Sequence, residues 1–250
     1  MIVYILFLVP FVQTNEVSLI GIELPGRSVS VLQLLENYSA SCTPREGKHN
    51  SALDQITQMM RDLDGEEVAK KMYNSLFFSA SDMKMDKLMG TWYTVVDSKL
   101  VHSEDCTVTY MTMLSQSQYS ASFSLVQYSM RGGQIKVNEG YGKKTGPDPG
   151  ELLISTGHEE DECPYMPVRV GGLQADGSFR YIVLSQPLKF PTMVLARDPS
   201  EFNAKFRAEV SEFVERFGFM SPVSAINTRL HFVNTTSCSH LTLPFHNLYF

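Results

Sequence analysis

The chain has 250 residues, of which 43% are hydrophobic and 19% are charged, so one large domain, or one domain with an extension, can bury a sizeable core. The formal net charge at pH 7 is −6, and no run of Lys and Arg is longer than two residues. This acidic balance argues against a nucleic-acid-binding protein and against binding to an anionic membrane surface.

The first predicted element is the apolar segment Met1–Val12, which precedes three polar residues. A membrane-spanning helix needs about 20 apolar residues, so this segment is too short to cross a bilayer. Its length suits the core of a secretory signal peptide, which we expect over 1–14. The alternative is a buried N-terminal strand, because no basic residue precedes the apolar core. No later segment is apolar enough over sufficient length to predict a transmembrane helix.

Residues 15–82 are expected to form an N-terminal extension that is partly helical. Ser51 can cap a helix, with Asp54 three residues later. Apolar residues then recur at helical spacing, with one interruption at Asp64-Gly65. This pattern predicts two short helices or one bent helix before the main domain.

From Gly90 onward the hydrophobic period changes to two, which is typical of β-strands. Gly132-Gly133 and Asp176-Gly177 suit tight hairpins, and the segment 146–150, with two prolines, suits a loop. Eight antiparallel strands are expected, at 91–97, 106–114, 119–130, 133–142, 151–157, 167–174, 178–186 and 191–197. Such strands form an up-and-down barrel or a sandwich. Sequential hairpins and a single late helix favour an all-β barrel with one C-terminal helix.

The late helix is amphipathic and is expected over 199–217. Asp198 can cap it, Pro199 suits its first turn, and Gly218 can end it. Its apolar stripe must pack against another surface, and the outer wall of a barrel is the natural one. The expected organisation is therefore a signal peptide at 1–14, an extension at 15–82, a barrel with its helix at 83–240 and a tail at 241–250.

The four cysteines are widely spaced, and none forms a C-x-x-C pair. They give no support for a zinc ribbon or a thioredoxin-type site and indicate two disulfides, for which the sequence allows three pairings. N-glycosylation sequons begin at Asn37 and Asn234. Together with the apolar N-terminal segment, these features predict a secreted, disulfide-bonded glycoprotein.

No catalytic or cofactor motif stands out. The nucleophile motif G-x-S-x-G, the zinc-protease motif H-E-x-x-H and the phosphate-binding P-loop are absent from the sequence. We therefore predict no enzymatic activity and no cofactor. The acidic run His158–Cys163 contains ligand types that suit a cation, but it lies between two strands, and a solvated loop is the simpler interpretation. No metal site is predicted.

Two short runs, one at the first and one at the last strand of the predicted barrel, resemble the lipocalin signature. Asp86–Tyr93 contains Gly90 and Trp92, the only tryptophan, where a helical turn gives way to a strand. Met193–Pro199 contains Arg197, just before the helix. The sequence resembles apolipoprotein D-like lipocalins and is similar to nematode lipocalin-related proteins. This resemblance implies a clasp in which Arg197 stacks on the indole, a contact worth about 0.5–2 kcal/mol. Alternatively, the two side chains never meet.

The resemblance also implies a disulfide pairing and a cavity. Cys106 is expected to pair with Cys238, and Cys42 with Cys163. An eight-stranded barrel can hold one small ligand, and one face of each strand would line the cavity or simply fill a core. An error of one residue in register would place the chosen residues on the other face. The residues predicted to face inward are Tyr110, Phe123, Leu125, Ile135, Val137, Leu153, Val168, Tyr181 and Val183.

The function implied by the resemblance is a secreted protein that binds or transports a small hydrophobic ligand of the lipid, sterol or fatty acid class. The alternative is an extracellular-matrix or interaction protein, whose outer surface and N-terminal extension bind partners and whose cavity is incidental. A third class, an enzyme similar to the few catalytic lipocalins, has no candidate residues in this sequence.

Overall fold

The protein is described here by a computed structural model. The residues that the structure describes are 38, 40–42, 83–98, 101–117, 120–144, 152–186, 189–219 and 230–240. The predicted signal peptide, the predicted helices of the extension and the sequon at Asn37 lie outside these residues.

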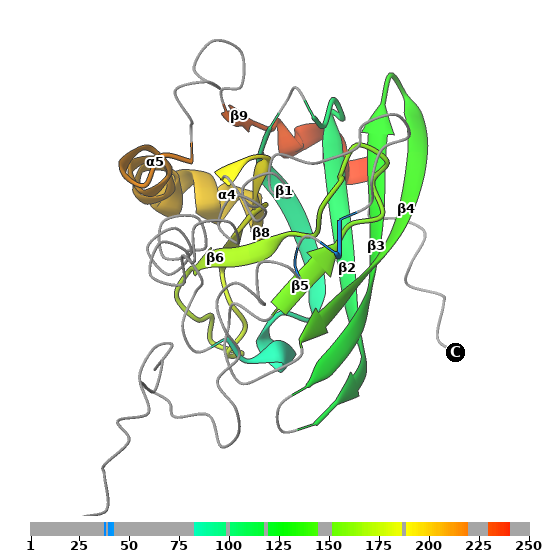
Figure 1. Ribbon diagram of the computed structural model, residues 1–250. Coiled ribbons are helices and arrows are strands. Elements are labelled where there is room, and N and C mark those ends of the chain that lie inside the picture. Colours follow the sequence, from blue (N-terminus) through cyan, green and yellow to red (C-terminus); the bar gives the residue numbers. More distant parts are fainter. Residues whose placement is uncertain are drawn as a thin grey trace, which may run out of the picture.

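Eight antiparallel strands form a nearly closed barrel (Figure 1). Seven of the eight neighbouring pairs around the ring are antiparallel ladders, and β1 pairs with both β2 and β8. The remaining neighbours, β5 and β6, are linked by a bridge in which the backbones of Ile154 and Tyr165 exchange two hydrogen bonds of 2.7 and 2.8 Å. The predicted all-β barrel is therefore confirmed. Its strands are β1 (Gly90–Ser98), β2 (Cys106–Gln116), β3 (Ala121–Arg131), β4 (Gln134–Lys144), β5 (Leu152–Ser155), β6 (Met166–Val170), β7 (Tyr181–Ser185) and β8 (Thr192–Ala196).

The two ends of the barrel differ. At one end, which we call the clasp end, the short 3-10 helix η1 (Met85–Lys87) leads into β1 (Figure 1). Because consecutive strands are antiparallel, the connections β1–β2, β3–β4, β5–β6 and β7–β8 all lie at the opposite end, which we call the loop end. The functional groups described below divide between these two ends.

The predicted helix is present and packs on the outside of the barrel (Figure 1). It consists of α4 (Pro199–Glu201), the π-helical turn η4 (Phe202–Phe206) and α5 (Arg207–Arg216). The Asp198 side chain accepts hydrogen bonds from two backbone N–H groups of the first turn, and Gly218 follows the last turn with a φ of 69°. The apolar face of the helix packs on a set of outward-facing barrel residues, namely Val95, Val96, Val168, Tyr181, Val183, Val194 and Ala196. No helix among the described residues has the length and apolar character needed to span a membrane.

Both expected disulfides are present. Cys106 of β2 bonds to Cys238, which lies in the 3-10 helix η6 (Thr235–His240). The segment 230–240, called the tail from here on, also adds β9 (Leu230–Phe232) beside the end of β1. Cys42 bonds to Cys163, which lies between β5 and β6. The two disulfides therefore fix the tail to one wall and the extension to the loop end.

Removing the Cys106–Cys238 disulfide should destabilise the protein by about 2–4 kcal/mol, because the bond closes a loop with a sequence separation of 132 and so restricts the unfolded chain. The Cys106→Ser/Cys238→Ser double variant should therefore unfold at a lower denaturant concentration than the wild type, as measured by circular dichroism. An unchanged midpoint would show that this disulfide does not stabilise the barrel.

Candidate functional site

The clasp end is closed by a contact between Trp92 and Arg197. The Arg197 guanidinium carbon lies 3.8 Å from the centroid of the indole ring, which is fully buried. The guanidinium also donates hydrogen bonds to the backbone carbonyl oxygens of Thr91, at 2.7 Å, and of Lys87, at 3.2 Å. Burial lowers the pKa of Arg197 to about 10, so the group remains charged at neutral pH. The clasp expected from the sequence is therefore formed.

Gly90 is required by the geometry of this clasp. Its φ is +99°, a conformation that side chains rarely adopt, and a Cβ atom there would lie 3.0 Å from a nitrogen of Arg197. The indole N–H donates to the carbonyl oxygen of Leu88 at 2.7 Å. The turn from η1 into β1 therefore holds the tryptophan ring in place beneath the guanidinium.

Above the clasp, the inner face of the barrel is apolar. We call this set the inner apolar cluster; it includes Trp92, Met111, Phe123, Leu125, Leu152, Ile154, Tyr165, Ile182, Leu184, Met193 and Leu195. Met83 and Met85, from the segment before β1, belong to it as well. Methionine side chains are flexible and adapt to irregular shapes. The cluster can therefore change its packing more readily than one built from branched side chains.

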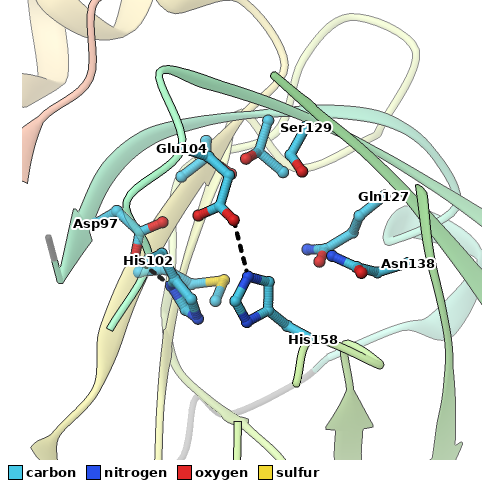
Figure 2. A pocket seen from close by; sticks show the side chains of 10 residues that line it. Asp97, His102, Glu104, Gln127, Ser129, Asn138 and His158 are labelled. Atoms are coloured by element: carbon cyan, nitrogen blue, oxygen red, sulfur yellow. Dashed lines mark hydrogen bonds and ion pairs between the residues drawn. The ribbon is translucent and has the colours of Figure 1, made fainter. Parts of the chain in front are cut away.

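Toward the loop end the lining becomes polar (Figure 2). A cavity of about 10 Å³, large enough for one water molecule, lies among side chains from β1, β2, β3, β4 and β8 and from two loops at that end. We call this site the polar chamber. It is lined by Thr94, Asp97, His102, Glu104, Thr107, Gln127, Ser129, Asn138, His158 and Met193.

His102 is held between two carboxylates beside the chamber. Its Nδ1 lies 2.7 Å from Asp97 Oδ1, and its Nε2 lies 3.1 Å from Asp161 Oδ1. Burial disfavours the charged ring, but the negative charge of Asp97 and the hydrogen bonds to both carboxylates outweigh that effect and raise the pKa of His102 to about 11. Both ring nitrogens therefore act as donors, and the imidazole is a cation at neutral pH.

His158 has a different role. Its Nδ1 accepts a hydrogen bond from the backbone N–H of Glu160 at 3.1 Å, and its Nε2 lies 2.9 Å from Glu104 Oε1. A nitrogen that accepts a backbone N–H carries no proton, so His158 is neutral and donates from Nε2. The Glu104 side chain is 5% exposed. Burial alone would raise its pKa, but the hydrogen bond from His158 lowers the pKa of Glu104 to about 2.

Asp161 connects this region to the rest of the loop end. Besides His102, its carboxylate accepts hydrogen bonds from Tyr165, at 2.7 Å, Gln186, at 3.3 Å, and Thr156. The expectation that 158–163 is a solvated loop is therefore wrong in part, because its His158 and Asp161 side chains are buried in the barrel. Among the described residues, no group of three or more His, Cys, Asp or Glu side chains is arranged to hold a metal ion.

A sequence model of the lipocalin domain matches residues 69–246, well over half of the chain. The chain belongs to the lipocalin family. No curated protein matches it. The match covers both halves of the clasp and the whole lipocalin barrel, and lipocalins are generally binding or transport proteins rather than enzymes.

The lipocalin barrel places only two of the nine residues predicted to face inward, Phe123 and Leu125, in the inner apolar cluster. The inward orientation is wrong for the others. Tyr110 packs outside, against the Cys106–Cys238 disulfide. Ile135 and Val137 are 58% and 49% exposed on the outer face of β4. Leu153 lies on the face opposite its inward neighbours, and the helix covers three more, namely Val168, Tyr181 and Val183.

The inward face of several strands was assigned wrongly because both faces of these strands are apolar. The helix covers the outer face of β6–β8, and the tail covers part of β2, so these strands lack the alternation that identifies an inward face. β3 keeps its alternation, with buried residues at every second position, and there the assignment succeeded.

Sequence reasoning missed the polar chamber because its charged members come from separate connections. His102 and Glu104 lie between β1 and β2, and His158 lies between β5 and β6. One signal was available: Gln127 and Ser129 continue the inward positions of Phe123 and Leu125 along β3, so the inner face changes from apolar to polar toward the loop end.

Proposed function

We propose that this lipocalin is a secreted carrier that binds a small hydrophobic ligand inside its barrel. The observation that supports the proposal is the inner apolar cluster, which extends from the clasp toward the polar chamber and contains several methionines. A ligand that enters from the loop end would displace flexible side chains rather than rigid ones. Apolar walls with a few convergent polar groups are the usual composition of a small-molecule site.

The sequence and the disulfides support secretion. All four cysteines form disulfides, which persist in oxidising compartments. The sequon residue Asn234 is exposed on the described surface and so is accessible to glycosylation. Together with the signal peptide proposed for 1–14, these features suit an extracellular protein. Expression in eukaryotic cells, followed by mass spectrometry of the culture medium, tests both secretion and the modification of Asn37 and Asn234.

A charge in the inner apolar cluster should abolish the binding of an apolar fluorescent probe. Phe123 is fully buried, and Phe123→Asp would leave a carboxylate without a partner. The Ile135→Asp control places the same charge on the outer face of β4, where the parent residue is 58% exposed and the carboxylate is solvated. We expect stoichiometric probe binding for the wild type and the control, and none for Phe123→Asp, in a fluorescence titration.

Because Phe123→Asp will also destabilise the barrel, a milder variant accompanies it. Met111→Gln keeps the length of the side chain but buries an amide in the inner apolar cluster. It should remain folded by circular dichroism and bind the probe at least tenfold more weakly. A folded wild-type protein that takes up no apolar probe at micromolar concentration would contradict the carrier proposal.

One observation favours the alternative function, an interaction protein of the extracellular matrix. On the outer face of β4, Ile135, Val137 and Tyr141 follow the period of the strand and are 58%, 49% and 62% exposed. Exposed apolar rows of this kind often mark protein contacts. If the wild type bound no apolar probe and Ile135→Lys/Val137→Lys abolished its retention in an extracellular matrix, the alternative would replace the carrier proposal.

A further inference from the structure

We propose that the polar chamber binds the ammonium group of a hydrophobic amine, whose apolar body lies against the inner apolar cluster. The inference rests on the carrier function proposed above and names the chemical class of the ligand. Three observations carry it: the charge around the chamber, two buried polar groups without partners, and the position of Met193.

The chamber carries an excess of negative charge. His102 is the one cation in this group of described residues, and its two ring nitrogens already face Asp97 and Asp161. Glu104 is a third carboxylate, and its partner His158 is neutral because its Nδ1 accepts the backbone N–H of Glu160. The chamber residues Asp97 and Glu104, together with Asp161 beside the chamber, supply three carboxylates against one cationic ring. The two negative charges in excess favour a cationic ligand group.

In two polar side chains that line the chamber, one atom has no hydrogen-bond partner among the described residues. They are Ser129, through its Oγ, and Asn138, through its Nδ2, and these residues are 1% and 6% exposed. Buried polar groups without partners are uncommon and costly. Figure 2 shows both residues around the same chamber as Glu104. Their lack of partners indicates that a polar group from outside the chain completes the site.

An ammonium group matches these side chains in size and in hydrogen bonding. It has three N–H donors, and the chamber offers the Glu104 carboxylate, the Ser129 hydroxyl and, after rotation of its amide, the Asn138 carbonyl oxygen. The volume of about 10 Å³ suits a group of the size of a water molecule. A fatty acid would instead bring its carboxylate toward Glu104, which like-charge repulsion opposes.

Met193 connects the two parts of the proposed site. Its side chain belongs to the inner apolar cluster and also lines the polar chamber. An amine held at the chamber would therefore place its first methylene groups beside Met193. The rest of the apolar body would displace the flexible methionine side chains of the cluster.

The proposal can be tested at pH 7.4 by displacing an apolar fluorescent probe with dodecylamine, dodecanol or dodecanoate. Each ligand is used below its critical micelle concentration. The three ligands share one chain and differ in head group. We expect dodecylamine to bind at least tenfold more tightly than dodecanol, and dodecanoate to bind most weakly. Equal affinities, or a preference for dodecanoate, would overturn the amine proposal and leave the carrier function intact. Failure of all three to displace a probe that the protein binds would overturn it too, whereas failure to bind any apolar probe would contradict the carrier function itself.

Two variants locate the effect in the chamber. Glu104→Gln keeps an acceptor for His158 but removes the charge, so the preference for the amine over the alcohol should fall at least tenfold. Ser129→Ala removes a hydroxyl that has no partner among the described residues, so it should fold normally and weaken amine binding about threefold. Glu139→Gln, on the exposed outer face of β4, is the matched control and should leave all three affinities unchanged. An amine preference that survives in both chamber variants would place the head group elsewhere.

Discussion

Replacing Trp92 with Ala should lower the free energy of unfolding by about 3–5 kcal/mol, as expected for a buried aromatic side chain. The ring is fully buried in the inner apolar cluster, and its loss would leave a cavity at the clasp end. It would also remove the surface on which the Arg197 guanidinium lies at 3.8 Å and the indole N–H that binds Leu88. Urea denaturation followed by circular dichroism measures the change.

Two further substitutions separate packing from the cation–π contact. Trp92→Phe keeps most of the apolar volume and an aromatic face, so it should cost less than Trp92→Ala. Arg197→Lys keeps a positive charge but loses the planar group that donates to the backbone at Thr91 and Lys87. If Trp92→Ala lowered the stability by less than 1 kcal/mol, the clasp would not be what closes this end of the barrel.

Most of the sequence signals that predict this fold are local. The number and order of the eight strands, the helix with Asp198 and Gly218 at its ends, and the clasp all follow from patterns within a few residues or from the family resemblance, whereas several strand boundaries differ by two to four residues. The inward face does not follow from such patterns, because it depends on what covers the outside. Val183, for example, is fully buried, but beneath the helix rather than inside the barrel.

The charged residues of the polar chamber could not be grouped from the sequence, because they meet only when the barrel closes. His102 and Asp161 are 59 positions apart, and Glu104 and His158 are 54 apart. Neither pair belongs to a motif with fixed spacing. A run of charged residues between two strands is usually a solvated loop, and 158–163 differs because two of its side chains, His158 and Asp161, are buried in the barrel.

Removing Asp161 should destabilise the folded protein by about 3–5 kcal/mol, because several buried hydrogen-bond donors would lose the acceptor that they share. In Asp161→Ala, the His102 cation would keep only Asp97, and Tyr165 and Thr156 would lose the acceptor for their hydroxyl groups. Denaturant unfolding at pH 7 measures the loss. Lys136→Ala, which removes an exposed ion pair with Glu159, is a control that should change the stability by less than 1 kcal/mol.

Because His102 lies between Asp97 and Asp161, the wild-type protein should become less stable as the pH rises from 7 toward 9.5. The pKa of His102 is raised in the folded state to about 11 from an ordinary value of 6.5. The folded protein therefore keeps a proton that the unfolded chain releases, and the stabilisation, fully present below pH 6.5, is lost as the pH rises toward 11. For one proton the slope approaches about 1.4 kcal/mol per pH unit.

The window below pH 9.5 isolates the histidine from the other buried groups. Burial raises the pKa of Tyr38 and of Tyr165 above the ordinary value of 10, so these two residues add to the alkaline loss only at higher pH. All four cysteines are in disulfides and contribute no thiol titration. In His102→Gln the titrating ring is absent, so the stability between pH 7 and 9.5 should be nearly flat, although lower than that of the wild type at pH 7. A wild-type curve as flat as that of His102→Gln would show that the ring between Asp97 and Asp161 is not a cation, because only a proton held more tightly in the folded state produces the slope.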